Sequence, residues 1–214
     1  MKITTVTNVT VDGVMQGLGD RDEDRRNGFE RGGWARPLFD DEVASHLGRL
    51  YQRADAFLLG RRTYEVFANS WGTGTWGAKA GDNPISTALN TRPKYVVSNT
   101  LANPTWEGTT ILSGHKVTAI QELKSARTGE LQVHGSPSVV RWLLDHDLVD
   151  EITLLVYPVV LGQGERLFPA ADPDMSLNLI DSRATANGVM VQVFQPDGRP
   201  TYAAAKDGAP TQQT

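Results

Sequence analysis

Short apolar runs alternate with helical patterns along most of this chain. Residues 2–11, rich in threonine and valine, and the apolar run at residues 55–59 are typical of strands. Between them, residues 40–53 carry apolar side chains from Val43 to Leu50 at the spacing of one helix face. Asp40 predicts an N-cap for that helix, and the acidic residues after it suit the first turn of a helix.

The same alternation continues to about residue 195. Strands are predicted at 94–98, 109–112, 130–134 and 149–160, and helices at about 61–69, 115–127 and 137–146. Two late strands, near 176–185 and 188–195, flank Asn187-Gly188, a dipeptide that favours a tight hairpin turn. This order predicts an α/β fold in which helices cover both faces of a mostly parallel, mixed sheet with a C-terminal antiparallel hairpin.

Three stretches break the alternation. Residues 12–37 hold six glycines and the charged run 20–26, which predicts a long loop of the kind that is usually functional or disordered. Residues 70–84 are also glycine-rich, carry Trp71 and Trp76, and predict a second loop. From residue 203 the composition predicts a disordered tail, so we expect a single domain over residues 1–202.

Composition narrows the class of protein. The chain has 214 residues, 39% of them hydrophobic, which suits one globular domain. It contains no cysteine, which excludes disulfides, thiolate catalysis and cysteine-based zinc sites. The net charge of −4 disfavours a large nucleic-acid footprint. The polar N-terminus and the lack of a long apolar run give no sign of export or of a membrane span, so we expect a cytoplasmic protein.

The most informative segment is the end of the strand at residues 55–59. Gly60 is followed by a helix start that carries Arg61, Arg62 and Thr63. A helix start exposes backbone N–H groups and the positive end of a dipole, and guanidinium groups add charge that suits a phosphate. A capped surface helix with solvated arginines is the alternative, since such starts are common.

Two further strand ends carry similar groups. Ser98 and Asn99 end one strand with hydroxyl and amide donors, and Gly135 and Ser136 form a second glycine turn into a helix. Ligands of open parallel sheets bind beyond the carboxyl ends of the strands. Two helix starts with a polar strand end between them therefore predict a nucleotide site.

These motifs, in this order, resemble the dihydrofolate reductase-like family, in particular the branch that includes the reductase domain of riboflavin biosynthesis. The resemblance spans about 160 residues and rests on four segments: residues 10–17, residues 58–65, residues 133–136, and residues 148–168 with the Gly162-Gln163-Gly164 turn. Such proteins have a three-layer α/β/α fold, and the resemblance implies hydride transfer from NADPH.

The resemblance also implies a role for each motif. The cofactor phosphates would lie on Gly60, Arg61, Arg62 and Thr63, and Ser98 and Asn99 would lie near the adenosine 2′-phosphate. Gly135 and Ser136 would contact the pyrophosphate and the nicotinamide ribose. The first loop, from Asp12 through Met15 to Gly17, would close over the nicotinamide.

The proton donor is not fixed by the sequence. The family position for an acid falls near the helix start, where Asp40 and Asp41 are candidates, although both also suit a helix cap. Asp12 is a third candidate, although Asp-Gly is equally typical of a turn. His134 lies next to the predicted site, where we favour a packing or hydrogen-bonding role, and the four histidines show no metal spacing.

Three functions follow from these expectations. The first is an NADPH-dependent reductase of a small heterocyclic or carbonyl substrate, with 5-amino-6-(5-phosphoribosylamino)uracil as the leading candidate. The second is dihydrofolate reductase activity, and the third is a nucleotide-binding sensor or scaffold without catalysis. We expect a homodimer, because members of this family pair and the predicted strand at residues 149–160 is long and apolar. A strand buried inside one chain would explain that apolar stretch equally well.

Overall fold

A computed structural model describes residues 1–72, 83–126, 128–169 and 174–203. Its eight strands form one sheet: β1 (Lys2–Thr10), β2 (Ala56–Gly60), β3 (Lys94–Val97), β4 (Thr109–Leu112), β5 (Glu130–His134), β6 (Glu151–Tyr157), β7 (Leu177–Ala184) and β8 (Met190–Pro196). The helices are α1 (Asp41–Arg53), α2 (Arg61–Phe67), α3 (Pro84–Thr91), α4 (Lys116–Ala126) and α5 (Pro137–Asp145). Short helical turns lie at Arg26–Gly28, Arg36–Leu38 and Ala68–Gly72.

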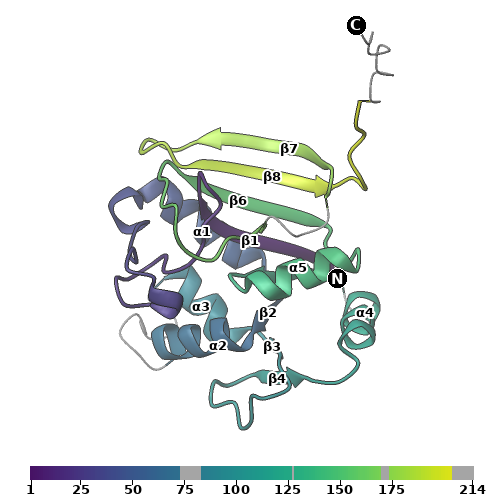
Figure 1. Ribbon diagram of the computed structural model, residues 1–214. Coiled ribbons are helices and arrows are strands. Elements are labelled where there is room, and N and C mark those ends of the chain that lie inside the picture. The colour runs from purple at the N-terminus through teal and green to yellow at the C-terminus, as the bar shows by residue number, and fades with distance from the viewer. Residues whose placement is uncertain (73–82, 127, 170–173, 204–214) are drawn as a thin grey trace, which may run out of the picture.

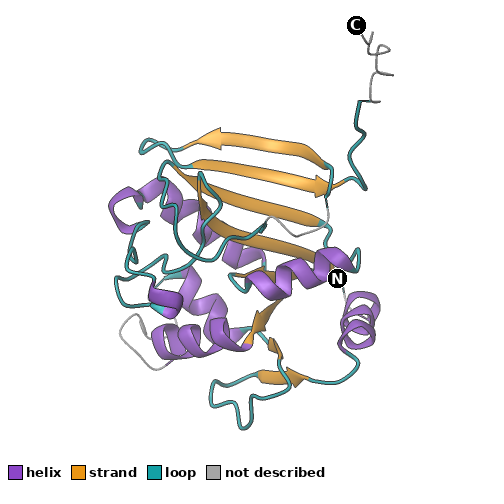
Figure 2. Cartoon of the chain, in the orientation of Figure 1, coloured by secondary structure: helices purple, strands orange, loops and turns teal. Residues whose placement is uncertain are grey.

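The strand order across the sheet is β4-β3-β2-β5-β1-β6-β8-β7. The first six strands of that order are parallel, and β8 and β7 are antiparallel additions at one edge. Asn187-Gly188 lies in the turn between β7 and β8, where the Gly188 N–H donates to the Thr185 carbonyl at 2.9 Å. The predicted mixed sheet and its closing hairpin are therefore confirmed (Figure 2).

Two helical layers enclose the parallel part of the sheet. Side chains of α4 and α5 pack on one face, together with Ile3, Leu58 and Val133. Side chains of α1, α2 and α3 pack on the other face, which includes Phe57 and Leu59. Figure 1 shows α5 in front of the sheet. Because β2 is covered on both faces, residues 56–59 are all buried, which explains their uninterrupted apolar run.

One predicted strand is shorter in the structure, and one helix was not predicted. The strand predicted at 149–160 spans only Glu151–Tyr157, because Pro158 lacks an N–H and cannot continue the ladder. Helix α3 was not predicted, although Asn83 caps it through a 2.8 Å bond from the Ser86 N–H and Pro84 occupies its first turn. Most of the loop predicted at residues 70–84, including Trp76, falls within residues 73–82, which lie outside the described residues. The eight-residue helix α3 begins shortly after them.

A buried lysine closes the C-terminal end of α3. Lys94 is fully buried, and its ammonium group donates to the carbonyls of Leu89 at 2.8 Å and Arg92 at 3.0 Å. It also lies 4.7 Å from the centre of the Trp106 ring. Burial lowers its pKa to about 8, and the two carbonyls and the ring compensate for the lost hydration.

Among the described residues, no helix is long and apolar enough to cross a membrane. The tail predicted from residue 203 lies outside the described residues from residue 204 onward. One domain over residues 1–202 and a disordered tail therefore stay predictions.

Candidate functional site

Three strand ends converge at the carboxyl edge of the sheet. Strands β3, β2 and β5 are neighbours and parallel, with Gly60 beside Val97 and Leu58 beside Val133. Their carboxyl ends therefore lie at one edge, where the chain continues into Ser98, Arg61 and Gly135. The order of the strands therefore brings the three motifs at Gly60, Ser98 and Gly135 to one edge of the sheet, as the sequence predicts.

Ser136 joins the two glycine turns. Its Oγ accepts a 2.9 Å hydrogen bond from the Gly60 N–H and lies 2.7 Å from the Thr63 hydroxyl. A Cβ on Gly60 would lie 3.2 Å from a methyl carbon of Val139 and 3.4 Å from that same Oγ. The close approach explains why glycine stands at residue 60, and the start of α2 is fixed against the start of α5.

The turn before α5 has an unusual backbone. Gly135 has a φ of 57° and Ser136 a φ of 55°, so two successive residues are left-handed. A serine in that region is strained, and such strain persists where the surroundings enforce it, often at functional sites. Here the three side-chain contacts of Ser136 hold the turn, and Pro137 starts the helix directly afterwards.

Arg61 is held beside the end of β3. Its Nη1 donates to the Thr100 hydroxyl at 2.8 Å, and its Nε donates to a Glu65 carboxylate oxygen at 2.7 Å. Ser98 orders the neighbouring segment, because its Oγ accepts from the N–H groups of Thr100 and Leu101. The guanidinium group is thereby oriented while 47% of the side chain stays exposed. Asn99 is also exposed.

This edge suits an anionic ligand. The first backbone N–H groups of α2 have no acceptor inside the helix, and the Gly60 cap offers no side chain to satisfy them. Arg61 and Arg62 are both exposed at the same turn. The backbone donors and the two guanidinium groups at this turn are thus opposed by a single carboxylate among the described residues, that of Glu65, which pairs with Arg61. The residues present fit the phosphates of a nucleotide.

The first loop is fixed at the same edge by a residue that sequence reasoning missed. The Gln16 side chain is buried, accepts from the Glu165 N–H at 2.9 Å, and donates to the Arg26 carbonyl at 3.1 Å. Its backbone carbonyl accepts from the Trp34 indole at 2.8 Å. The neighbouring Met15 N–H donates to the Glu165 carbonyl at 2.9 Å. A buried amide with this many partners shows no signal in a single sequence.

A backbone hydrogen bond also holds Gly17, the next residue of the loop. The Gly17 carbonyl accepts from the Gly33 N–H at 2.7 Å. Where the loop meets the turn at residues 163–165, a hollow of about 440 Å³ is lined by Gln16, Arg26, Asn27, Phe29, Gln163, Gly164 and Glu165. Met15 and Gly17, predicted to border the nicotinamide, therefore flank a residue that faces a hollow at the carboxyl edge of the sheet.

Asp12 ties this loop to the segment after β6. Its carboxylate accepts from the Thr10 hydroxyl at 2.6 Å and from the N–H groups of Leu161 at 3.1 Å and Gly162 at 2.8 Å. Burial alone would raise its pKa, but these hydrogen bonds outweigh burial and lower the pKa to about 2. The carboxylate is therefore ionised at neutral pH and occupied by structural partners.

Asp40 is the N-cap of α1, as its position in the sequence predicts. It accepts from the Val43 N–H at 2.8 Å and from the Asn187 N–H at 3.2 Å. These bonds lower its pKa, the bond from Val43 most of all. Asp41 is exposed in the first turn, and no hydrogen bond or ion pair of its carboxylate is found within the described residues. The catalytic role predicted for one of these acids stays a prediction.

His134 lies under the Ser136 turn and packs inside the protein. Its ring stacks on Tyr51 with the centres 4.1 Å apart, and Nε2 lies 2.9 Å from the Gln132 side-chain oxygen. Burial lowers its pKa to about 3, so the ring is neutral at physiological pH. Among the described residues, no group of three or more potential metal ligands is present.

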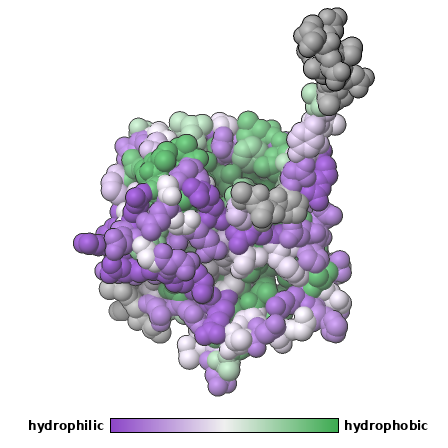
Figure 3. Space-filling view, in the orientation of Figure 1, coloured by the Kyte–Doolittle hydropathy of each residue, from purple (hydrophilic) through white to green (hydrophobic). Residues whose placement is uncertain are grey.

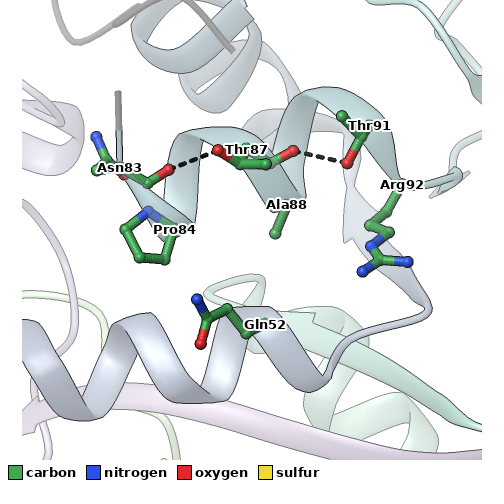
Figure 4. A pocket seen from close by; sticks show the side chains of 7 residues that line it. All are labelled: Gln52, Asn83, Pro84, Thr87, Ala88, Thr91 and Arg92. Carbon is green, nitrogen blue, oxygen red and sulfur yellow. Dashed lines mark hydrogen bonds between the residues drawn. The ribbon is translucent and has the colours of Figure 1, made fainter. Parts of the chain in front are cut away.

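A second hollow lies away from these strand ends. A groove of about 350 Å³ lies along the contact between α1 and α3 and is lined by Gln52, Asn83, Pro84, Thr87, Ala88, Thr91 and Arg92 (Figure 4). The hydroxyls of Thr87 and Thr91 donate to carbonyls of their own helix. Gln52 and Arg92 lie near the amino ends of β2 and β3, so this groove is separate from the candidate site.

The fold and this edge define a dihydrofolate reductase-like protein with three layers. The model of the RibD C-terminal domain family matches residues 1–191, so the chain belongs to that family. The uncharacterised protein YyaP of Bacillus subtilis (strain 168) is 25% identical over 148 residues, which cover 67% of this chain and 75% of the relative.

Two crystal structures share the fold. A protein described as a riboflavin biosynthesis protein, from Shewanella sp. PV-4, matches with a TM-score of 0.70 and 19% identity, over 92% of this chain and 99% of the other. A pyrimidine reductase-like protein from Corynebacterium diphtheriae matches with a TM-score of 0.58 and 14% identity, over 92% of each chain. At these identities the likeness concerns the fold alone.

Proposed function

We propose that this protein is an NADPH-dependent reductase of a small heterocyclic substrate, of the 5-amino-6-(5-phosphoribosylamino)uracil reductase type. The observation that carries the proposal is the link between Gly60 and Ser136, which sets two helix starts side by side at the carboxyl edge of the sheet. Membership of the RibD C-terminal domain family supports a reductase of the riboflavin type.

The cofactor would supply the hydride, and this chain would bind and orient it. Gly60, Arg62 and Thr63 would hold its phosphates at the start of α2, and Gly135 with Ser136 would lie against the pyrophosphate. Arg61, which Thr100 orients beside Ser98 and Asn99, would pair with the adenosine 2′-phosphate. A guanidinium group favours a phosphate over a hydroxyl at that position, so we expect NADPH to bind more tightly than NADH.

Reduction of the substrate also needs a proton, and the contacts of the three candidate acids limit where it can come from. Asp12 and Asp40 are ionised and occupied by backbone donors, so neither holds a proton to give at neutral pH. Asp41 is the one candidate acid without such partners among the described residues. We propose that the proton comes from water, either directly or through Asp41.

The occupied carboxylates of Asp12 and Asp40 favour a second candidate function, a nucleotide-binding protein without catalysis. A site that binds NADPH but holds no carboxylic acid would suit a sensor. The two candidates differ in turnover and share cofactor binding.

A turnover assay separates these functions. NADPH oxidation would be followed at 340 nm with the phosphoribosylaminopyrimidine substrate, with dihydrofolate, and with a panel of small carbonyl compounds. Oxidation that depends on the pyrimidine supports the proposal, and oxidation with dihydrofolate alone would replace it with the folate reaction. Tight NADPH binding without turnover on any substrate would favour the sensor.

A further inference from the structure

The start of the first loop pairs with the segment that follows β6. The Met15 N–H donates to the Glu165 carbonyl at 2.9 Å, and the Leu167 N–H donates to the Gly13 carbonyl at 3.0 Å. An antiparallel bridge lies between these two bonds. The start of the loop is therefore held by the backbone of residues 165–167, and a shift of that segment is passed on to the loop.

Arg141 ties this segment to α5. Its Nη1 donates to the Arg166 carbonyl at 3.1 Å and to the Leu167 carbonyl at 3.3 Å, and its Nη2 lies 3.7 Å from Glu165 Oε1. The guanidinium group thus contacts three successive residues, and only 23% of the side chain is exposed. Helix α5 starts at the Ser136 turn, so Arg141 lies on the same helix as the proposed pyrophosphate contact.

Glu165 extends the connection to a later part of the loop. Its second carboxylate oxygen, Oε2, lies 3.3 Å from Arg26 Nη2, and Arg26 Nε donates to Asp24 at 2.7 Å. An isolated exposed ion pair contributes little, but a carboxylate shared by two guanidinium groups belongs to a network. Glu165 therefore joins α5 to two points of the loop, to Met15 through its backbone and to Arg26 through its side chain.

Polar contacts matter here because much of the loop is hydrophilic. Phe29 and Trp34 are buried and anchor its second half, whereas most residues of the charged run at 20–26 are exposed. Figure 3 shows mainly hydrophilic residues on the left of the molecule, where Figure 1 draws this loop. The first half of the loop is thus held to a large extent by hydrogen bonds and ion pairs.

We infer that Arg141 is a positioning residue, which couples the cofactor turn at Ser136 to the first loop through Glu165. A helix that carries the turn at its start and Arg141 in its second turn moves both together. A loop held in this way would close over the nicotinamide and exclude water from the hydride transfer. That consequence rests on the proposed function, whereas the coupling itself is a property of the free protein.

Hydrogen–deuterium exchange of the Met15 amide measures the coupling without any ligand. We expect Arg141→Ala to speed this exchange about 10-fold and Ser136→Ala about 3-fold, with the amides of β1 and β5 much less affected. The double variant should exchange no faster than Arg141→Ala alone, because Ser136 acts on the loop through Arg141. Independent sites would instead multiply to about 30-fold.

Two conservative variants and one control show whether the effect is specific. Glu165→Gln keeps the shape of the side chain, removes its charge, and should also speed the exchange of the Met15 amide. Arg141→Lys keeps a donor and a positive charge and should restore most of the native rate. Asp145→Ala, an exposed residue at the end of α5, is the control and should leave the rate unchanged.

Turnover adds a second measurement. Arg141→Ala should lower kcat at least about 5-fold and change the KM for NADPH less than about 2-fold, because the cofactor contacts stay in place. A native protein without turnover would contradict the proposed function alone, since the exchange rates need no reaction. Unchanged Met15 exchange in Arg141→Ala, equal acceleration in Asp145→Ala or throughout β1 and β5, or a fully multiplicative double variant would overturn the inference.

Discussion

Gly60 and Ser136 lie 76 positions apart in the chain and are joined by a 2.9 Å hydrogen bond from the backbone N–H of one to the hydroxyl of the other. The bond connects the end of β2 to the start of α5 and fixes the relative positions of two helix N-termini. It also uses the N–H of the N-cap glycine, so that the backbone donors left without an acceptor in the helix are those of the next three residues.

Ser136→Ala should weaken both the fold and the site. The Gly60 N–H would lose its acceptor, which costs about 1–3 kcal/mol when the donor is shielded from water. We expect a lower free energy of unfolding in urea and NADPH affinity reduced about 10-fold. Ser138→Ala, an exposed serine at the same helix start, is the control and should change neither quantity. Equal effects of both substitutions would argue against the role of Ser136.

Arg61→Ala should affect the two nicotinamide cofactors differently. Loss of a charge-assisted contact to the 2′-phosphate should weaken NADPH about 10- to 100-fold and leave NADH nearly unchanged. Fluorescence titration of both cofactors measures the ratio. Arg92→Ala, at the groove between α1 and α3, controls for loss of general positive charge. Equal losses for NADPH and NADH would show that Arg61 does not contact the 2′-phosphate.

Several of these features could be predicted from the sequence. The strand ends at Gly60, Ser98 and Gly135 were visible because apolar runs stop at glycine or polar residues. Parallel pairing then determines that they share an edge. The N-cap role of Asp40 and the hairpin at Asn187-Gly188 follow from local rules.

Other features depend on contacts between distant residues. Gln16 and Ser136 act through partners more than 70 positions away, to which local patterns are blind. In the sequence, Lys94 is an ordinary polar residue at the start of a strand. Its burial is possible because carbonyl groups at the C-terminal end of α3 accept its hydrogen bonds.

Asp12 should give a stability change at acid pH. Its folded pKa of about 2 lies below the usual 3.8, so its stabilisation is complete above about pH 4 and is lost as the pH falls toward 2. The loss is at most about 2.5 kcal/mol, at roughly 1.4 kcal/mol for each pKa unit. Asp12→Asn should flatten the stability profile in that window, as measured by urea unfolding. An unchanged slope would contradict the hydrogen-bonded carboxylate.

Two buried histidines should make the stability of the fold depend on pH in a higher range than Asp12 does. The pKa of His134 is lowered to about 3 by burial, and that of His46 to about 4 by burial and the nearby Arg183. The unfolded chain binds these protons near pH 6.5, so the stability due to neutral rings is lost as the pH falls from 6.5 toward 4. His134→Phe should reduce the slope of stability against pH there, whereas the exposed His115→Phe should leave it unchanged. Equal slopes in all three proteins would contradict the buried neutral ring.

The proposed function requires that the Gly60 turn hold the phosphates of NADPH. Titration of the native protein with NADPH and with NADH, followed by tryptophan fluorescence, tests it most directly. We expect saturable binding of one NADPH per chain, at least about 10-fold tighter than NADH, because one charge-assisted phosphate contact distinguishes the two cofactors. No binding of either cofactor, or equal affinity for both, would contradict it.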